Sequence, residues 1–99
     1  MNYKDFIAKV KQLPKFSAQD IKKHNKIADA WIVLANIFDE IDNPIVLDIT
    51  KFINEHPGGS DILLPYLGKE CGQEFLQYHV EGTSDAYDFI MSLTIGTML

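Results

Sequence analysis

The sequence predicts a small α+β domain in which a short mixed sheet supports two pairs of helices, and the helices form the walls of a pocket. Three observations lead to this fold class. Residues 31–38 and residues 45–49 are apolar runs rich in β-branched residues, which is typical of buried strands. Apolar residues at helical spacing precede and follow these runs. Two histidines, His56 and His79, stand beside the predicted helices of the second half.

Residues 1–14 are predicted to be an N-terminal helical extension, and residues 15–99 to be the domain. Tyr3, Phe6, Ile7 and Val10 fall at helical spacing, so a short amphipathic helix should end near residues 13–14. We expect this helix to pack on the outside of the domain; a helix that docks a partner is the alternative.

A second helix should start at residue 18 and stop near residues 24–25. Ser17 to Asp20 form a capping box in which Asp replaces Glu, and Phe16 and Ile21 stand at the staple positions. The strands predicted at residues 31–38 and 45–49 are then neighbours. Residues 39–44, which connect them, have turn chemistry with Asn-Pro near the end.

The second half of the chain is predicted to be mainly helical. Residues 50–55 form a helical turn, and Ser60 caps a short helix over residues 61–64, which Pro65 and Gly68 end. A helix over about residues 70–78 then leads to His79. The last helix starts at residue 83 or 84, and the chain leaves it through residues 94–96. One face of this helix carries Ala86, Phe89, Ile90 and Leu93.

The two histidines carry the chemistry. His56 opens the stretch His56-Pro57-Gly58-Gly59, in which a ring-locked residue and two glycines fix the direction of one imidazole. His79 follows 23 residues later. Two neutral imidazoles that face each other across an apolar crevice are what an axially ligated haem iron needs. The plainer interpretation is two surface histidines beside a turn, and the joint pattern favours ligation. An iron with two imidazole ligands has no open position for a substrate, so one-electron exchange is the expected chemistry.

The residues around both histidines resemble cytochrome b5-like haem domains. Residues 52–59, Phe-Ile-Asn-Glu-His-Pro-Gly-Gly, preceded by Asp-Ile-Thr-Lys, are similar to the family signature, and residues 74–79 are similar to the segment that carries the second ligand. The resemblance runs from about Lys15 to Leu99, and the 23-residue interval looks like that of the b5-like domain of nitrate reductases. It implies His56 and His79 as the iron ligands. The haem-contacting positions that it implies are Ile49, Phe52, Pro57, Gly58, Gly59, Ile62, Leu63, Phe75, Tyr78 and Phe89.

The sequence departs from the family pattern at three places. The connection from Trp31 to Asp48 is about twice as long as usual, and we expect it to lengthen a hairpin away from the ligands. Tyr78 stands where the family more often has a small aliphatic residue. Residues 80–82 resemble an insertion before the final helix, which should loosen the pocket rim.

Composition limits the partners and the cofactor. The net charge of −5 and the pI near 4.9 argue against nucleic acid and favour a partner with a basic face. One cysteine, Cys71, rules out an internal disulfide and fits a reducing compartment. There is no Cys-x-x-Cys-His, so the expected haem b is bound non-covalently. No signal peptide or membrane span is visible, so we expect a soluble, cytoplasmic monomer; an anchor outside these residues stays open.

The expected function is that of an electron carrier without substrate turnover of its own, working between a flavin reductase and an acceptor oxidoreductase. Carboxylates near the predicted pocket mouth either dock a basic redox partner or are merely solvated; they are Glu55, Asp61, Glu70 and Glu74. One alternative is a module of the same fold that binds haem or a small apolar ligand without two histidines. Another is the haem domain of a larger oxidoreductase.

Overall fold

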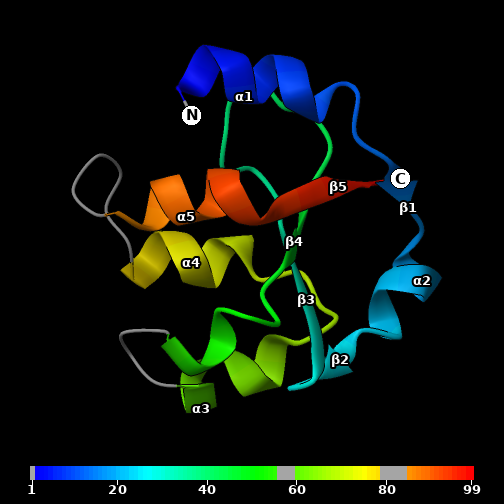
Figure 1. Cartoon of the computed structure of the whole chain (residues 1–99). Helices are drawn as coiled ribbons and strands as arrows, with labels where there is room; N and C mark the ends of the chain where they lie inside the picture. Colours follow the sequence, from blue (N-terminus) through cyan, green and yellow to red (C-terminus); the bar gives the residue numbers. More distant parts are fainter. Residues whose placement is uncertain (1, 56–59, 79–84) are drawn as a thin grey trace.

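The computed structural model describes residues 2–55, 60–78 and 85–99 of the chain (Figure 1). The helices are α1 (Tyr3–Val10), α2 (Ala18–Lys22), α3 (Ser60–Leu63), α4 (Gly72–Tyr78) and α5 (Ala86–Leu93), with short 3₁₀ helices η1 (Ile53–Glu55) and η2 (Leu64–Tyr66). The strands are β1 (Lys15–Phe16), β2 (Asn25–Lys26), β3 (Asp29–Leu34), β4 (Ile45–Asp48) and β5 (Thr94–Met98). The predicted α+β class is therefore confirmed.

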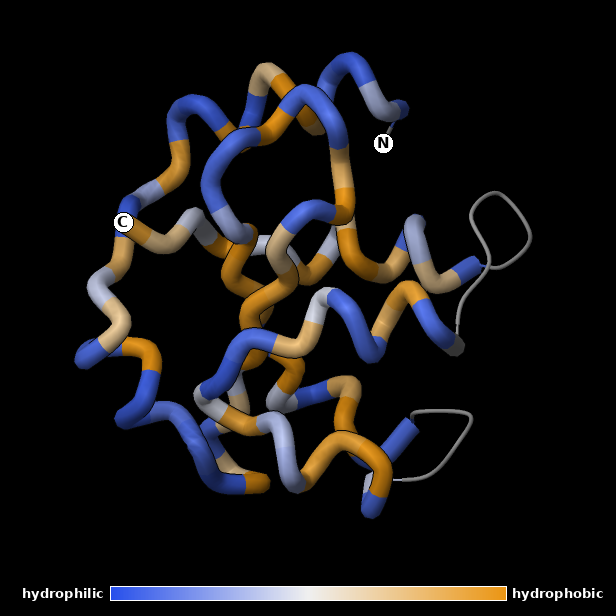
Figure 2. Tube along the Cα trace, turned by 180° about the vertical axis from the view of Figure 1, so that it is seen from behind, coloured by the Kyte–Doolittle hydropathy of each residue, from blue (hydrophilic) through white to orange (hydrophobic). Residues whose placement is uncertain are grey.

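One mixed sheet runs through the domain in the order β1-β5-β4-β3-β2. The predicted neighbours β3 and β4 pair antiparallel, with Trp31 opposite Asp48 and Leu34 opposite Ile45. β1 pairs parallel to β5, which makes the sheet mixed. Figure 2 shows that hydrophobic residues concentrate along the central strands, while the α2 and β2 segment at the edge is largely hydrophilic. The sheet thus forms the floor of the core, and the helices of the second half stand on it.

The end of the chain differs from the prediction, because residues 94–98 form strand β5, which is an inner strand of the sheet. We predicted that the chain simply leaves the last helix there. Strand β5 lies between β4 and β1. Gly96 in β5 leaves room for the segment that carries β1. A Cβ on Gly96 would lie 2.4 Å from the Pro14 carbonyl oxygen and 2.6 Å from the Phe16 ring. Only glycine lets the N-terminal segment approach this closely.

The strand predicted at residues 31–38 begins two residues earlier and ends at Leu34. Two features end it. The Ala35 N–H donates to the Glu70 carboxylate at 2.9 Å instead of to a strand, and Asn36 has a φ of 60°, which breaks the extended backbone. Apolar composition alone did not reveal either feature.

The long connection from β3 to β4 packs beneath α1 rather than extending the hairpin. Asn2 caps α1 by accepting from the Asp5 N–H at 2.8 Å. Phe6 is fully buried in a cluster with Val10 and Met91, and the connection contributes Phe38 and Ile41 to that cluster. The prediction that α1 packs on the outside of the domain is therefore confirmed, and the longer connection supplies its docking surface.

The remaining helices agree with the sequence in position and differ in detail. Ser17 caps α2 by accepting from the Asp20 N–H at 3.1 Å, as predicted. Ser60 is the first residue of α3 rather than the residue before it. Pro65 ends the α-helical geometry, but the chain continues as η2 to Tyr66 and then turns at Gly68, whose φ is +75°.

Candidate functional site

The predicted site lies where two pairs of helical elements end. Residues 56–59 lie between η1 and α3, and residues 79–84 lie between α4 and α5. The element ends that flank these two stretches are on the same side of the molecule in both views (Figures 1 and 2). His56, Pro57, Gly58, Gly59 and His79 are outside the described residues.

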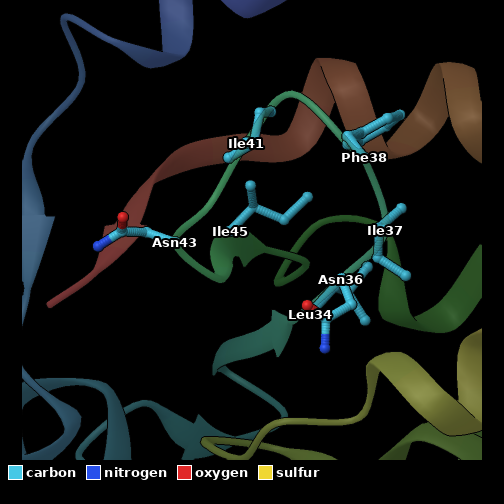
Figure 3. Close-up of a pocket in the computed structure, with 7 residues that line it drawn as sticks. All are labelled: Leu34, Asn36, Ile37, Phe38, Ile41, Asn43 and Ile45. Atoms are coloured by element: carbon cyan, nitrogen blue, oxygen red, sulfur yellow. The ribbon is translucent and has the colours of Figure 1, made fainter.

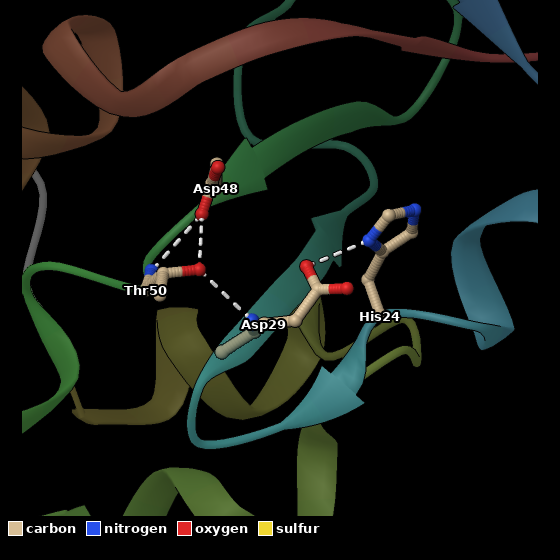
Figure 4. Close-up of polar contacts among 5 residues, drawn as sticks. His24, Asp29, Asp48 and Thr50 are labelled. Carbon is tan, nitrogen blue, oxygen red and sulfur yellow. Dashed lines mark hydrogen bonds and ion pairs between the residues drawn. The ribbon is translucent and has the colours of Figure 1, made fainter.

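A small polar network holds the segment that leads to residue 56 (Figure 4). Asp48 Oδ1 accepts from the Thr50 N–H at 3.0 Å and from the Thr50 hydroxyl at 2.6 Å. The same hydroxyl accepts from the Ala30 N–H at 2.9 Å, and the Ile49 N–H donates to the Ala30 carbonyl at 2.8 Å. The Asp-Ile-Thr motif thus ties the turn after β4 to the neighbouring strand. It fixes the direction in which the chain enters η1.

The start of α4 is held by the opposite edge of β3. The Gly68 N–H donates to the Trp31 carbonyl at 2.6 Å, and the Cys71 N–H donates to the Val33 carbonyl at 2.8 Å. The Glu70 carboxylate accepts from the N–H groups of both Gly72 and Ala35. Glu70 therefore caps the helix that leads to residue 79, and this is a structural use of a residue that we predicted at an acidic rim.

Cys71 lies beside this cap, and its thiol is expected to be unreactive. Its side chain is buried, and it belongs to the main core cluster. Burial, followed by the nearby negative charges of Glu70 and Glu74, raises the pKa of the Cys71 thiol from 9.0 to about 12. The thiol therefore stays protonated at neutral pH and packs as a small buried side chain.

The predicted pocket-lining residues divide into a buried base and an exposed wall. Ile49 is buried, and Phe52, Leu63 and Phe75 are partly buried against the same core cluster. Phe89 on α5 is 47% exposed, and Ile62 on α3 is 50% exposed. Tyr78 is the last residue of α4, and its side chain is outside what the structure describes.

One aromatic contact joins the two helix pairs, and a second lies within the pair α4 and α5. The ring centroids of Phe52, just before η1, and Phe89, on α5, are 5.0 Å apart. Phe75 on α4 contacts Tyr87 on α5 edge to face at 5.5 Å. The structure therefore brings two predicted residues, Phe52 and Phe89, into contact, while the third, Phe75, contacts Tyr87. Sequence analysis missed Tyr87 because the helical face chosen for α5 was centred on Phe89 and Ile90.

The exposed apolar residues fit an apolar group bound between these helices. When large exposed hydrophobic side chains cluster on a small domain, the cluster usually marks a binding surface. Sequence analysis missed two more exposed residues of the second half: Leu64, the first residue of η2, is 38% exposed, and Leu76 on α4 is 43% exposed. Their helical spacing was visible, but their exposure was not.

A hollow elsewhere on the surface does not compete with this site. It lies on the connection between β3 and β4, lined by Ile37, Phe38 and Ile41 among others (Figure 3), and encloses no space for a water molecule. Among the described residues, no helix is long and apolar enough to cross a membrane.

The fold and the site define a class: a small α+β domain whose helices present an apolar, aromatic wall over a mixed sheet. Comparison with known proteins specifies the family. The family model of the cytochrome b5-like heme/steroid binding domain matches residues 17–99. The chain therefore belongs to the cytochrome b5-like heme/steroid binding domain family.

Curated relatives and solved structures agree with this membership. Cytochrome b5 of Drosophila melanogaster is 31% identical over 85% of this chain and 55% of its own length. The nitrate reductase [NADH], clone PBNBR1412, of Brassica napus is 34% identical over 65% of this chain and 6% of its own length. The chain thus spans about half or less of these relatives. Cytochrome b5 of Ostreococcus tauri virus 2 superposes with a TM-score of 0.67 at 27% identity, covering 84% of this chain and 94% of that one. Ectothiorhodospira vacuolata cytochrome b558, a prokaryotic homologue of cytochrome b5, superposes with a TM-score of 0.68 at 25% identity, covering 87% and 99%.

Proposed function

We propose that this domain binds haem b non-covalently and carries one electron between a flavin reductase and an acceptor oxidoreductase. In this proposal, residues 15–99 form the haem domain, residues 1–14 are a helical extension, and His56 and His79 are the axial ligands. The observation that carries the proposal is the contact of Phe52 with Phe89, with Phe75 on α4 against the same core cluster as Phe52, on the elements that flank both histidines. An apolar wall beside two imidazole donors suits a flat, largely apolar macrocycle that contains iron.

The residues of this chain would contribute binding, orientation and exclusion of water. When bound by two imidazoles, haem supplies one-electron exchange with no open position for a substrate. Phe52, Phe75 and Phe89 would keep water away and lower the local polarity, which is a determinant of reduction potential. The Asp48 and Thr50 network and the Glu70 cap hold the turn after β4 and the start of α4, which lead toward the two histidines, and anchored supports of this kind favour a preorganised site.

The carboxylates near the site support a partner of opposite charge. Glu55 and Asp61 are exposed, and no lysine follows Lys69 in the sequence. A negative surface around α3, α4 and α5 would attract a partner with a basic face and speed their encounter at low salt. The carrier would act as a monomer and would have no substrate of its own.

Replacing each histidine in turn tests the ligand assignment, and the third histidine of the chain provides a matched control. His56→Ala and His79→Ala should each open an iron position, weaken haem retention and make the reduced spectrum sensitive to carbon monoxide. His24→Ala should leave the spectrum unchanged, because the His24 ring stacks on Trp31 and its Nδ1 lies 2.7 Å from Asp29 Oδ1. A six-coordinate low-spin spectrum in His79→Ala would show that His79 is not a ligand.

The family description also names steroids, so an apolar small molecule is the second candidate ligand. The exposed side chains of Ile62, Leu76 and Phe89 would suit it equally well. Titration of the protein with haem and with a steroid distinguishes the two functions. Steroid binding that survives both histidine replacements, without haem binding by the unmodified protein, would favour this second function.

A further inference from the structure

The turn between β2 and β3 carries an unexpected residue. Residues 27 and 28 connect Lys26 to Asp29, which pair across the hairpin. Two-residue hairpin turns favour Asn, Asp and Gly, whereas this turn begins with Ile27. The Ile27 side chain is 48% exposed. A β-branched apolar residue at an exposed turn contributes little to the core, so core packing does not explain Ile27 and a binding role is considered.

Exposed lysines surround this turn. Lys22 and Lys23 stand at the end of α2, and Lys26 lies in β2 beside Ile27. Lys69 is close to this segment because Gly68, the residue before it, packs against the segment. A Cβ built on Gly68 would lie 3.2 Å from the Asn25 side chain and 3.4 Å from the Lys22 backbone. The hairpin therefore presents an apolar tip inside a group of positive charges, which we call the basic hairpin end: Lys22, Lys23, Lys26, Ile27 and Lys69.

The acidic residues at this end are engaged by other side chains. Asp29 faces the His24 ring at 2.7 Å, and Asp20 lies 3.8 Å from Lys23 in an exposed pair. An exposed pair at that distance is weak, so Lys23 remains accessible to another anion. Lys22, Lys26 and Lys69 are all exposed.

Charge is unevenly distributed along the chain, with most of its lysines in the first 26 residues. Residues 1–26 hold seven lysines and two aspartates, a balance of +5, whereas residues 70–99 hold five acidic residues and no lysine. The α2 and β2 segment lies on the opposite side of the molecule from the ends of α4 and α5 that flank residues 79–84 (Figure 1). The molecule measures 32 × 32 × 21 Å, several times the screening length of about 8 Å at physiological salt. The net charge of −5 therefore does not prevent the basic hairpin end from approaching an anionic surface.

We propose that the basic hairpin end contacts the surface of an anionic membrane, with Ile27 entering the boundary between headgroups and acyl chains. A lipid surface fits better than an acidic protein because one apolar residue on a protruding turn offers no flat area for a protein interface. Lysines act as point charges that lipid phosphates satisfy without a fixed geometry. This contact does not depend on the proposed electron transfer, and it leaves the ends of α4 and α5 accessible.

Vesicle sedimentation tests this contact with the whole chain. The probes are phosphatidylcholine vesicles with and without about 30% phosphatidylserine, in about 0.1 M salt. We expect binding only to the anionic vesicles. One lysine near such a surface contributes about 1 kcal/mol, so Lys26→Gln should weaken binding about fivefold. Ile27→Ser should weaken binding by a similar factor or more.

Two controls make the result decisive. Lys4→Gln removes an exposed lysine from α1, far from the hairpin, and should leave vesicle binding unchanged. Unaltered circular dichroism and thermal unfolding of Ile27→Ser would show that this variant is folded. Failure of the unmodified protein to sediment with anionic vesicles, or equal losses for Lys4→Gln and Lys26→Gln, would overturn the proposal. Preferential binding of the hairpin end to an acidic protein would overturn it as well.

Discussion

Replacing Glu70 separates its structural role from a docking role. The Glu70 carboxylate accepts hydrogen bonds from the Ala35 and Gly72 N–H groups, and so joins the end of β3 to the start of α4. A hydrogen bond to a charged group contributes about 1.5 to 3 kcal/mol. Glu70 is exposed, so water replaces part of what Glu70→Ala removes. We expect the free energy of unfolding to fall by about 1 to 2 kcal/mol. Glu70→Gln keeps an acceptor oxygen and should lose less than half of that.

Urea unfolding followed by circular dichroism measures this change, with Glu74→Ala as the matched control. Glu74 is also a carboxylate of the predicted acidic rim and lies in the first turn of α4. Its removal should cost no more than about 0.5 kcal/mol, through the helix dipole alone. Equal stability losses for Glu70→Ala and Glu74→Ala, or none for Glu70→Ala, would refute the capping argument. A purely docking role would instead slow reduction by a basic partner in both variants and leave stability unchanged.

Three further predictions follow from packing and charge. Phe6→Ala should lower the free energy of unfolding by about 3 kcal/mol, because Phe6 is fully buried between α1 and the domain. In the same urea denaturation assay, the control Lys4→Ala should lower it by less than about 0.5 kcal/mol. The Cys71 pKa is raised on folding, so the contribution of this thiol to the free energy of unfolding should be constant below pH 9 and fall as the pH rises toward 12. Alkylation of the thiol at pH 8 should be far slower in the native protein than in the protein unfolded in urea. Reduction by a basic redox protein should slow as salt rises, and a salt-independent rate would mean that the carboxylates are only solvated.

Local sequence patterns predicted those parts of the fold whose causes are local. The Ser17 cap, the pairing of β3 with β4 and the position of α4 follow from neighbouring residues. Strand β5 does not, because Thr94 to Met98 becomes a strand only through partners far away in the sequence. One of these is Phe16, opposite Met98 in the register of β1 with β5.

The candidate site shows the same division. The family resemblance gives Phe52, Phe75 and Phe89 as positions beside the histidines, and the structure places Phe52 in contact with Phe89. The role of Glu70 was not predictable, because its carboxylate reaches the Ala35 N–H, 35 residues away in the sequence. Tyr87 was missed because periodicity alone does not decide which of two adjacent helical faces meets Phe75.

An absorption spectrum of the protein after haem addition tests the central claim most directly. It is recorded in the oxidised form and after dithionite, with and without carbon monoxide. Our account predicts sharp low-spin bands that shift on reduction and do not respond to carbon monoxide, because His56 and His79 would occupy both axial positions. A spectrum that changes with carbon monoxide, or no haem binding at all, would contradict it.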